Sequence, residues 1–71
     1  MKPEEIKVGG VYSNGKGGVR RLIRIREHRI YEDAAIFELI AGREPSFPIS
    51  PGTYIMGLRS FARWANHEVK P

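Results

Sequence analysis

The chain contains no cysteine, so neither a disulfide framework nor a thiolate metal site is available to stabilise it. It also has no run that approaches the ~18 apolar residues of a membrane-spanning helix. Its first residues, Met-Lys-Pro-Glu-Glu-Ile-Lys, lack the apolar core of a secretory signal. Stability must therefore come from packing, and we expect a cytoplasmic protein without membrane contact.

Residues suited to catalysis or metal binding are sparse. His28 and His67 are far apart in the sequence, and neither has a neighbouring pattern of metal ligands. No serine occurs in a Gly-x-Ser-x-Gly sequence, and Glu32 and Asp33 fall in an expected turn, where acidic residues are ordinary. We therefore predict that the protein is not an enzyme and that it holds no metal and no cofactor.

The composition is that of an ordinary small globular protein. Of the 71 residues, 41% are hydrophobic and 28% are charged, which is too apolar for a disordered tail. A chain of this length has room for one small core, so we expect a single domain over residues 1–71. The formal charge of +4 favours acidic or polyanionic partners, although an excess of charge also serves solubility.

The stretch from Val19 to Glu27 is the longest strand-like run and also the most basic one. Alternate residues of a strand point to opposite faces. A regular strand would therefore turn Val19, Ile23 and Ile25 toward a core and present its other side to water. That outer side would carry the residues that we call the basic stripe, namely Arg20, Arg24 and Arg26, with Leu22 among them.

Residues 34–40 are expected to form the partner strand, because the segment between Asp33 and Gly42 is too short for a usual helix. We predict an antiparallel register with Arg24 opposite Glu38. One face then becomes continuously apolar, and the other carries an exposed ion pair that contributes about a few tenths of a kcal/mol. The same register pairs Ile23 with Leu39, Ile25 with Phe37, Leu22 with Ile40 and Arg26 with Ile36.

Short strands and turns account for most of the remaining chain. A first strand begins at Val11 and ends at the turn of residues 14–18, whose glycines can adopt a positive φ and reverse the chain. This turn lacks the Gly-Lys-Ser/Thr ending of a phosphate-binding loop, so we expect a hairpin there. Residues 53–56 are expected to form a further strand, and residues 67–71 are expected to fray.

The segment Gly42–Gly52 is rich in proline and is expected to be a loop. Its Phe47 and Ile49 are either a plug for one end of the core or an exposed apolar contact. We expect the plug, because exposed apolar patches are uncommon on a small monomer.

After Gly57 the apolar residues repeat with the period of a helix rather than a strand. We therefore expect a short helix that closes a barrel formed by the predicted strands, with Trp64 half buried on its flank. The residues at positions i, i+3, i+4 and i+7 of the buried face are Leu58, Phe61, Ala62 and Ala65.

Two local sequences resemble the ends of a group of small proteins. They are Gly10-Val11-Tyr12-Ser13-Asn14-Gly15-Lys16-Gly17-Gly18-Val19-Arg20-Arg21 and Ser60-Phe61-Ala62-Arg63-Trp64-Ala65. With the order of the elements, they are similar to small uncharacterised bacterial and phage-type proteins with an SH3-like barrel. The resemblance implies a mostly β fold, a strongly bent antiparallel barrel of about four to five strands with a short C-terminal helix. It implies no activity and no catalytic residue.

Two non-catalytic functions remain open. SH3-like barrels serve as docking modules for peptides, nucleic acids or other subunits, which is an analogy at the level of the fold. We expect docking to a protein partner, or to a second copy of the chain, to be the main function. It would use apolar residues bordered by arginines, namely Leu22, Ile36, Ile40, Phe47 and Trp64.

The alternative is nucleic-acid binding through phosphate contacts. It would use Lys16, Arg20, Arg24 and Arg26, with Tyr12 or Trp64 as a stacking surface. The resemblance also raises a phage-type inhibitor of a host enzyme, which no residue distinguishes from ordinary docking.

Overall fold

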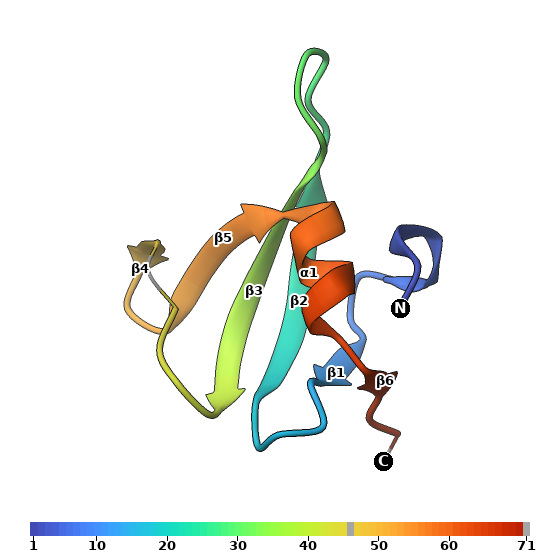
Figure 1. The fold of residues 1–71 in the computed structure, drawn as a ribbon. Coiled ribbons are helices and arrows are strands. Elements are labelled where there is room, and N and C mark those ends of the chain that lie inside the picture. Colours follow the sequence, from blue (N-terminus) through green and yellow to red (C-terminus); the bar gives the residue numbers. More distant parts are fainter. Residues whose placement is uncertain (46, 71) are drawn as a thin grey trace.

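The computed structural model describes residues 1–45 and 47–70, and its strands form one antiparallel sheet (Figure 1). The elements are η1 (Pro3–Glu5), β1 (Val11–Ser13), β2 (Val19–Arg26), β3 (Ala34–Ala41), β4 (Pro48–Ser50), β5 (Thr53–Gly57), α1 (Leu58–Trp64) and β6 (His67–Glu68). The strand order is β4-β5-β3-β2-β1-β6, so β4 and β6 form the two edges. A mostly β fold with one short α-helix is confirmed. Within residues 1–45 and 47–70 the sheet has six strands, and it is not closed into the expected barrel.

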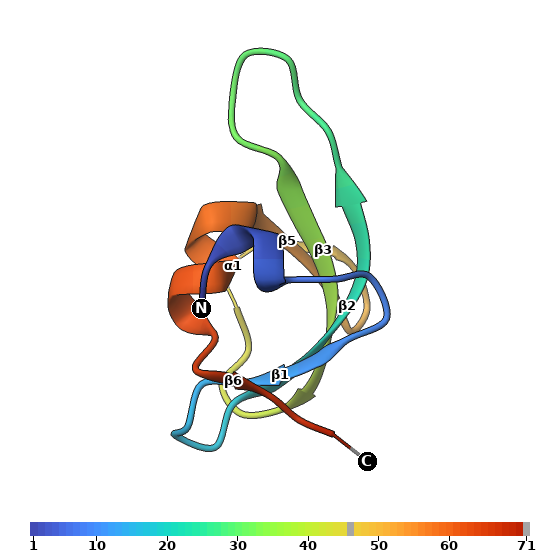
Figure 2. The same ribbon diagram turned by 90° about the vertical axis from the view of Figure 1, so that its right-hand side faces the viewer.

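The β2–β3 hairpin projects beyond the rest of the sheet (Figures 1 and 2). Both strands form within one residue of their predicted bounds, but the predicted register is wrong. Glu38 lies opposite Arg21, and Arg24 lies opposite Ile36. The Arg21–Glu38 ion pair, at 2.8 Å, has side chains that are 51% and 45% exposed. An ion pair so exposed contributes about a few tenths of a kcal/mol.

An irregularity in β2 explains the difference in register. The pairing with β3 shifts at the start of β2 and again between Leu22 and Arg24, where Ile23 is an extra, bulged residue. As a result, Arg20 and Leu22 face the core, while Ile25 keeps its expected inward position. Ile23 itself is 43% exposed, so the prediction that it faces inward is wrong. In a regular strand, successive side chains point strictly to alternate faces of the sheet. A bulge reverses this pattern on one of its two sides, so the faces predicted for those residues are exchanged.

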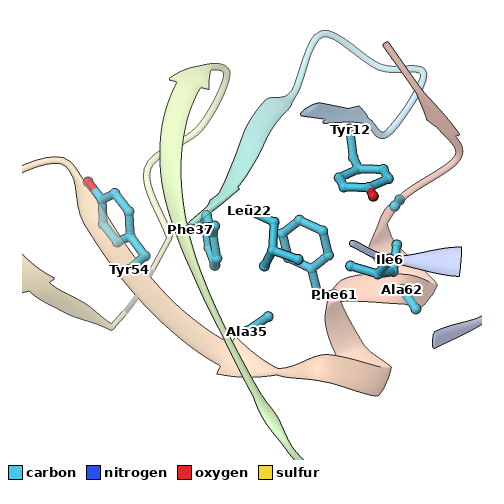
Figure 3. Packing of buried hydrophobic residues seen from close by; sticks show 9 residues of the cluster. Ile6, Tyr12, Leu22, Ala35, Phe37, Tyr54, Phe61 and Ala62 are labelled. Carbon is cyan, nitrogen blue, oxygen red and sulfur yellow. The ribbon is translucent and has the colours of Figure 1, made fainter. Parts of the chain in front are cut away.

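The core lies between one face of the sheet and α1 (Figure 3). Phe61 is fully buried at its centre, with its ring centroid 5.8 Å from Tyr12, 5.4 Å from Phe37 and 5.5 Å from Trp64. The predicted buried face of the helix is confirmed, although Leu58 is only partly buried. The buried cluster consists of Ile6, Tyr12, Leu22, Ala35, Phe37, Tyr54, Phe61, Ala62 and Ala65.

The start of α1 is held by the β2–β3 loop. The helix follows β5 directly, and its N-cap residue, Gly57, has no side chain that could accept a hydrogen bond. The Leu58 N–H donates to the carbonyl of Asp33 at 2.6 Å, and the Arg59 N–H donates to Glu32 Oε2 at 3.0 Å. The Glu32 carboxylate therefore takes the role that a capping side chain has in other helices.

Replacing Glu32 by alanine should lower the free energy of unfolding by about 1 kcal/mol, because the Arg59 N–H loses its acceptor. Urea denaturation followed by circular dichroism measures the change. Glu27→Ala is the matched control, since Glu27 is exposed and should change stability by less than about 0.5 kcal/mol. Equal losses in both variants would show that this hydrogen bond does not stabilise α1.

The C-terminal segment is better ordered than the sequence indicates. His67 and Glu68 pair with β1, and the Val69 N–H donates to the carbonyl of Val11 at 2.7 Å. The expected fraying is therefore wrong for residues 67–69, while Pro71 lies outside the described residues.

The proline-rich segment also differs from expectation. Pro48–Ser50 forms the edge strand β4, a position where the missing N–H of proline is tolerated, and Ser46 lies outside the described residues. Phe47 is 70% exposed and Ile49 is 53% exposed, so the expected plug is wrong. Tyr54, stacked on Phe37 with 5.8 Å between ring centroids, fills the core beside β4 instead.

Candidate functional site

The basic stripe does not form a single surface. Arg24 and Arg26 are exposed on the outer face of the sheet, whereas Arg20 faces the other side and is only 9% exposed. Lys16 is exposed in the β1–β2 turn, as expected. Tyr12 is 1% exposed and belongs to the core, so its ring offers no stacking surface. The residues predicted for nucleic-acid binding are therefore divided between two faces and the core.

The residues predicted for docking are divided in the same way. Leu22 is fully buried, so its predicted place on the outer face is wrong. Ile36 is 8% exposed and Ile40 is 46% exposed, and both lie on the outer side of β3. Phe47 is exposed and Trp64 is half buried, and each borders a hollow that Arg20 also borders.

Arg20 is the buried charged residue of the described part of the chain. Its guanidinium carbon lies 4.0 Å from the ring centroid of Trp64 and 4.6 Å from that of Phe37. Its Nη1 donates to Met56 Sδ at 3.3 Å, while its buried Nε–H has no acceptor within residues 1–45 and 47–70. Among those residues Arg20 also forms no ion pair. Aromatic rings and a thioether are weaker partners for a guanidinium than a carboxylate is.

Burial lowers the pKa of Arg20 from its ordinary value, because removing the guanidinium from water disfavours the charged form. The side chain nevertheless stays charged at neutral pH, as guanidinium groups in proteins do. The cation–π contacts offset part of the free energy of desolvation. Arg20 is therefore a buried positive charge with unused capacity to donate hydrogen bonds.

Three neighbouring hollows that share bordering residues, which we call the groove, lie among the β1–β2 turn, the β3–β4 connection, β5 and α1. The Arg20 hollow, about 620 Å³, is bordered by Lys16, Arg20, Arg43, Glu44 and Trp64. The apolar hollow, about 440 Å³, is bordered by Arg20, Pro45, Phe47, Ile55 and Met56. The side hollow, about 310 Å³, shares Lys16 and Trp64 with the first and adds Arg63. Arg20 stands where the basic and apolar parts of the groove meet.

Positive charge predominates at the basic end of the groove. Lys16, Arg43 and Arg63 are all exposed there. The acidic side chain at this end, Glu44, accepts a hydrogen bond from the Tyr54 hydroxyl at 2.7 Å. This bond raises the pKa of Tyr54 above its ordinary value. It also holds the Glu44 carboxylate on Tyr54 rather than on Arg20.

Glycine and asparagine shape the walls of the groove. In the β1–β2 turn, Asn14 Oδ1 accepts hydrogen bonds from the N–H groups of Lys16 at 2.8 Å and Gly18 at 2.9 Å. The predicted hairpin is confirmed there. Gly42, at φ +102°, packs so closely on this turn that a Cβ atom would lie 2.8 Å from Gly18 Cα. This contact sets the distance between the β1–β2 turn and the β3–β4 connection.

The acidic and histidine residues of the β2–β3 loop that were considered as catalytic candidates form hydrogen bonds that hold this loop and α1. Glu32 holds α1, and Asp33 Oδ1 accepts a hydrogen bond from the His28 N–H at 3.2 Å. His28 Nδ1 accepts hydrogen bonds from the N–H groups of Ile30 at 3.2 Å and Tyr31 at 3.1 Å. Across the described residues, no group of three or more His, Cys, Asp or Glu could hold a metal ion. The absence of catalysis, metal and cofactor stays a prediction.

The same described residues contain no helix long and apolar enough to cross a membrane.

Arg43, Arg63 and Met56 were not among the predicted site residues. In the sequence, the two arginines could be recognised by their positive charge and Met56 by its flexible, polarisable side chain. Their places in the groove could not be recognised, because only the packing of the hairpins on α1 brings their segments together. Arg43 lies in an expected loop, and Arg63 lies on the helix face turned away from the core. The position of Met56 is set by the pairing of β5 with β3.

The two local sequences that carry the resemblance form the β1–β2 hairpin and most of α1. They lie side by side at the basic end of the groove, where Lys16 and Trp64 border the same hollow and Gly18 packs closely against Trp64. The SH3-like barrel that the resemblance implies is not shown by the open sheet. No protein-family model, no curated protein and no solved structure matches the chain.

Proposed function

We propose that the protein is a non-catalytic binding module that holds an extended segment of a protein partner in the groove. The observation that supports this proposal is that a basic and an apolar hollow share Arg20 and Pro45 as bordering residues. The apolar part presents Phe47, an aromatic side chain that is 70% exposed, beside Met56. Arginine, methionine and aromatic residues are the types enriched at protein interfaces.

We also propose an SH3-like arrangement of the bent sheet, which agrees with this function. The order of β1, β2, β3, β5 and α1 is the order of elements expected from the sequence, and the resemblance rests on that order. Domains of that kind are docking modules, which is support by analogy of fold alone. The groove supports the same function independently, through contacts of this chain.

Selection from a random library of displayed peptides, with the intact protein immobilised, tests the proposal. We expect peptides to be enriched, and we expect them to shift the backbone amide signals of Lys16, Arg20 and Trp64 in nitrogen–proton correlation spectra. Phe47→Ser should weaken their binding about tenfold, because an apolar contact of roughly 1.5 kcal/mol or more is lost. Ile40→Ser, which removes an exposed apolar side chain of the outer face, should leave binding unchanged.

The absence of any enriched peptide would contradict the proposal. Peptides whose signal changes are confined to the outer face, around Ile40 and Arg24, would contradict it as well.

Nucleic-acid binding is the second candidate function, because Arg24 and Arg26 are exposed and form no ion pair within the described residues. Base stacking has little support, since Tyr12 is buried and Arg20 lies against the ring of Trp64. Single-stranded DNA added to the same sample distinguishes the two functions. Signal changes at Arg24 and Arg26 that weaken steeply with salt would favour nucleic acid.

A further inference from the structure

We infer that the groove recognises an aspartate or glutamate side chain of the partner segment, paired with the guanidinium of Arg20, together with a neighbouring apolar residue in the apolar hollow. This inference rests on the proposed function and adds the chemistry of the bound segment. It concerns a peptide carboxylate, not a phosphate of nucleic acid.

The unused donors of Arg20 are the first reason. A guanidinium has five N–H donors, and within the described residues one of them bonds the weak acceptor Met56 Sδ while the buried Nε–H has none. Because Nε is buried, a carboxylate in the groove would pair with the terminal Nη–H donors, and such bonds are the strongest that arginine makes in proteins. The contacts with Trp64 and Phe37 hold the guanidinium in place, so little side-chain freedom remains to be lost on binding.

The distribution of charge is the second reason. Lys16, Arg43 and Arg63 add positive charge around the basic end. Glu44, the one acidic residue that borders it in the described part of the chain, is held by Tyr54. These cations attract an acidic segment and oppose a basic one. An acidic residue of the partner would therefore meet Arg20 in a field that favours it.

The apolar hollow is the third reason, because it distinguishes a peptide from a nucleic acid. On this side of Arg20 the groove is bordered by Pro45, Phe47 and Met56. A sugar-phosphate chain that extended from Arg20 would leave this apolar surface without a partner. An apolar side chain next to the acidic residue covers it and gains from burial.

Pairs of synthetic peptides test the inference. Each pair consists of an enriched peptide with both ends blocked, so that no terminal charge remains, and the same peptide with glutamine or asparagine in place of the acidic residue. On the native protein, this change should lower the affinity at least about tenfold, as measured by isothermal titration calorimetry. On Arg20→Met, the two peptides of a pair should bind within about twofold of each other, because the close pair with Arg20 is gone and the exposed cations that remain contribute little.

Arg24→Met is the matched control. Arg24 lies in the same strand, across the bulge and on the outer face, and it is exposed. This variant should discriminate between the paired peptides as the native protein does. Thermal melting should show Arg20→Met folded, with a melting temperature equal to or above that of the native protein, because a buried charge has been removed.

The Arg20 Nε–H signal provides a measurement that needs no variant. It should shift when the acidic peptide is added and stay unchanged when the glutamine or asparagine peptide is added at equal saturation. Enriched peptides that bind in the groove without an acidic residue would overturn the inference and leave the proposed function standing. A library that yields no groove-binding peptide would overturn the proposed function itself.

Discussion

Phe61→Ala should remove most of the free energy of unfolding of the domain. Phe61 is fully buried, and its ring lies within 5.8 Å, centroid to centroid, of Tyr12, Phe37 and Trp64. Truncating a buried phenylalanine to alanine costs about 3–5 kcal/mol, because apolar contact is lost and a cavity remains. Small domains commonly have a total free energy of unfolding of only about 5 kcal/mol. The loss therefore approaches the whole stability of the domain.

Urea denaturation followed by tryptophan fluorescence measures this effect, because Trp64 contacts the altered position. Phe47→Ala is the matched control, since it makes the same chemical change at a side chain that is 70% exposed. We expect it to change the free energy of unfolding by less than about 0.5 kcal/mol. Similar losses in both variants would contradict the placement of the core between α1 and the sheet.

Gly42→Ala should lower the free energy of unfolding by about 2–4 kcal/mol, from two causes. Gly42 has a φ of +102°, where a residue with a Cβ atom is strained by about 1–3 kcal/mol. Its Cβ atom would also lie 2.8 Å from Gly18 Cα, which is backbone and yields little. Relieving that overlap requires the β3–β4 connection to move away from the β1–β2 turn. Thermal melting and urea denaturation measure the loss.

Gly52→Ala separates the two causes. Gly52 also has a positive φ, of +78°, but a Cβ atom there would meet nothing within 4 Å. We expect this control to lose about 1–2 kcal/mol, from backbone strain alone. If the two variants lost the same stability, the close approach of Gly42 to the turn would be contradicted.

The local elements of the fold could be predicted from the sequence, because each depends on nearby residues. The glycines around Lys16 specify the hairpin turn, and the spacing of Leu58, Phe61 and Ala62 specifies the buried helix face. Edge pairing could not be predicted in the same way. β4 and β6 form because a neighbouring strand offers free backbone groups, and their own residues give no strand pattern.

The candidate site could be predicted only in part. Lys16, Arg20, Trp64 and Phe47 were singled out, but they were divided between two different surfaces. Because of the bulge, Arg20 faces the groove rather than the outer face, and the residue types in β2 do not predict a bulge. Arg43 could not be assigned, because its place beside Trp64 depends on strand pairing over a long sequence separation.

The extra residue in β2 affects both the twist of the hairpin and the side of the sheet to which its residues point. Ile23 has no partner in β3, since Leu22 lies opposite Phe37 and the next paired residue, Arg24, lies opposite Ile36. A chain shortened by Ile23 alone would still place Leu22 inward and Arg24 outward, because the residues that remain alternate regularly. What it would lose is the local increase in twist that a bulge gives. The bulge thus gives the hairpin its extra twist, and it also lets Leu22 and Ile25 face the same side of the sheet although they are three residues apart.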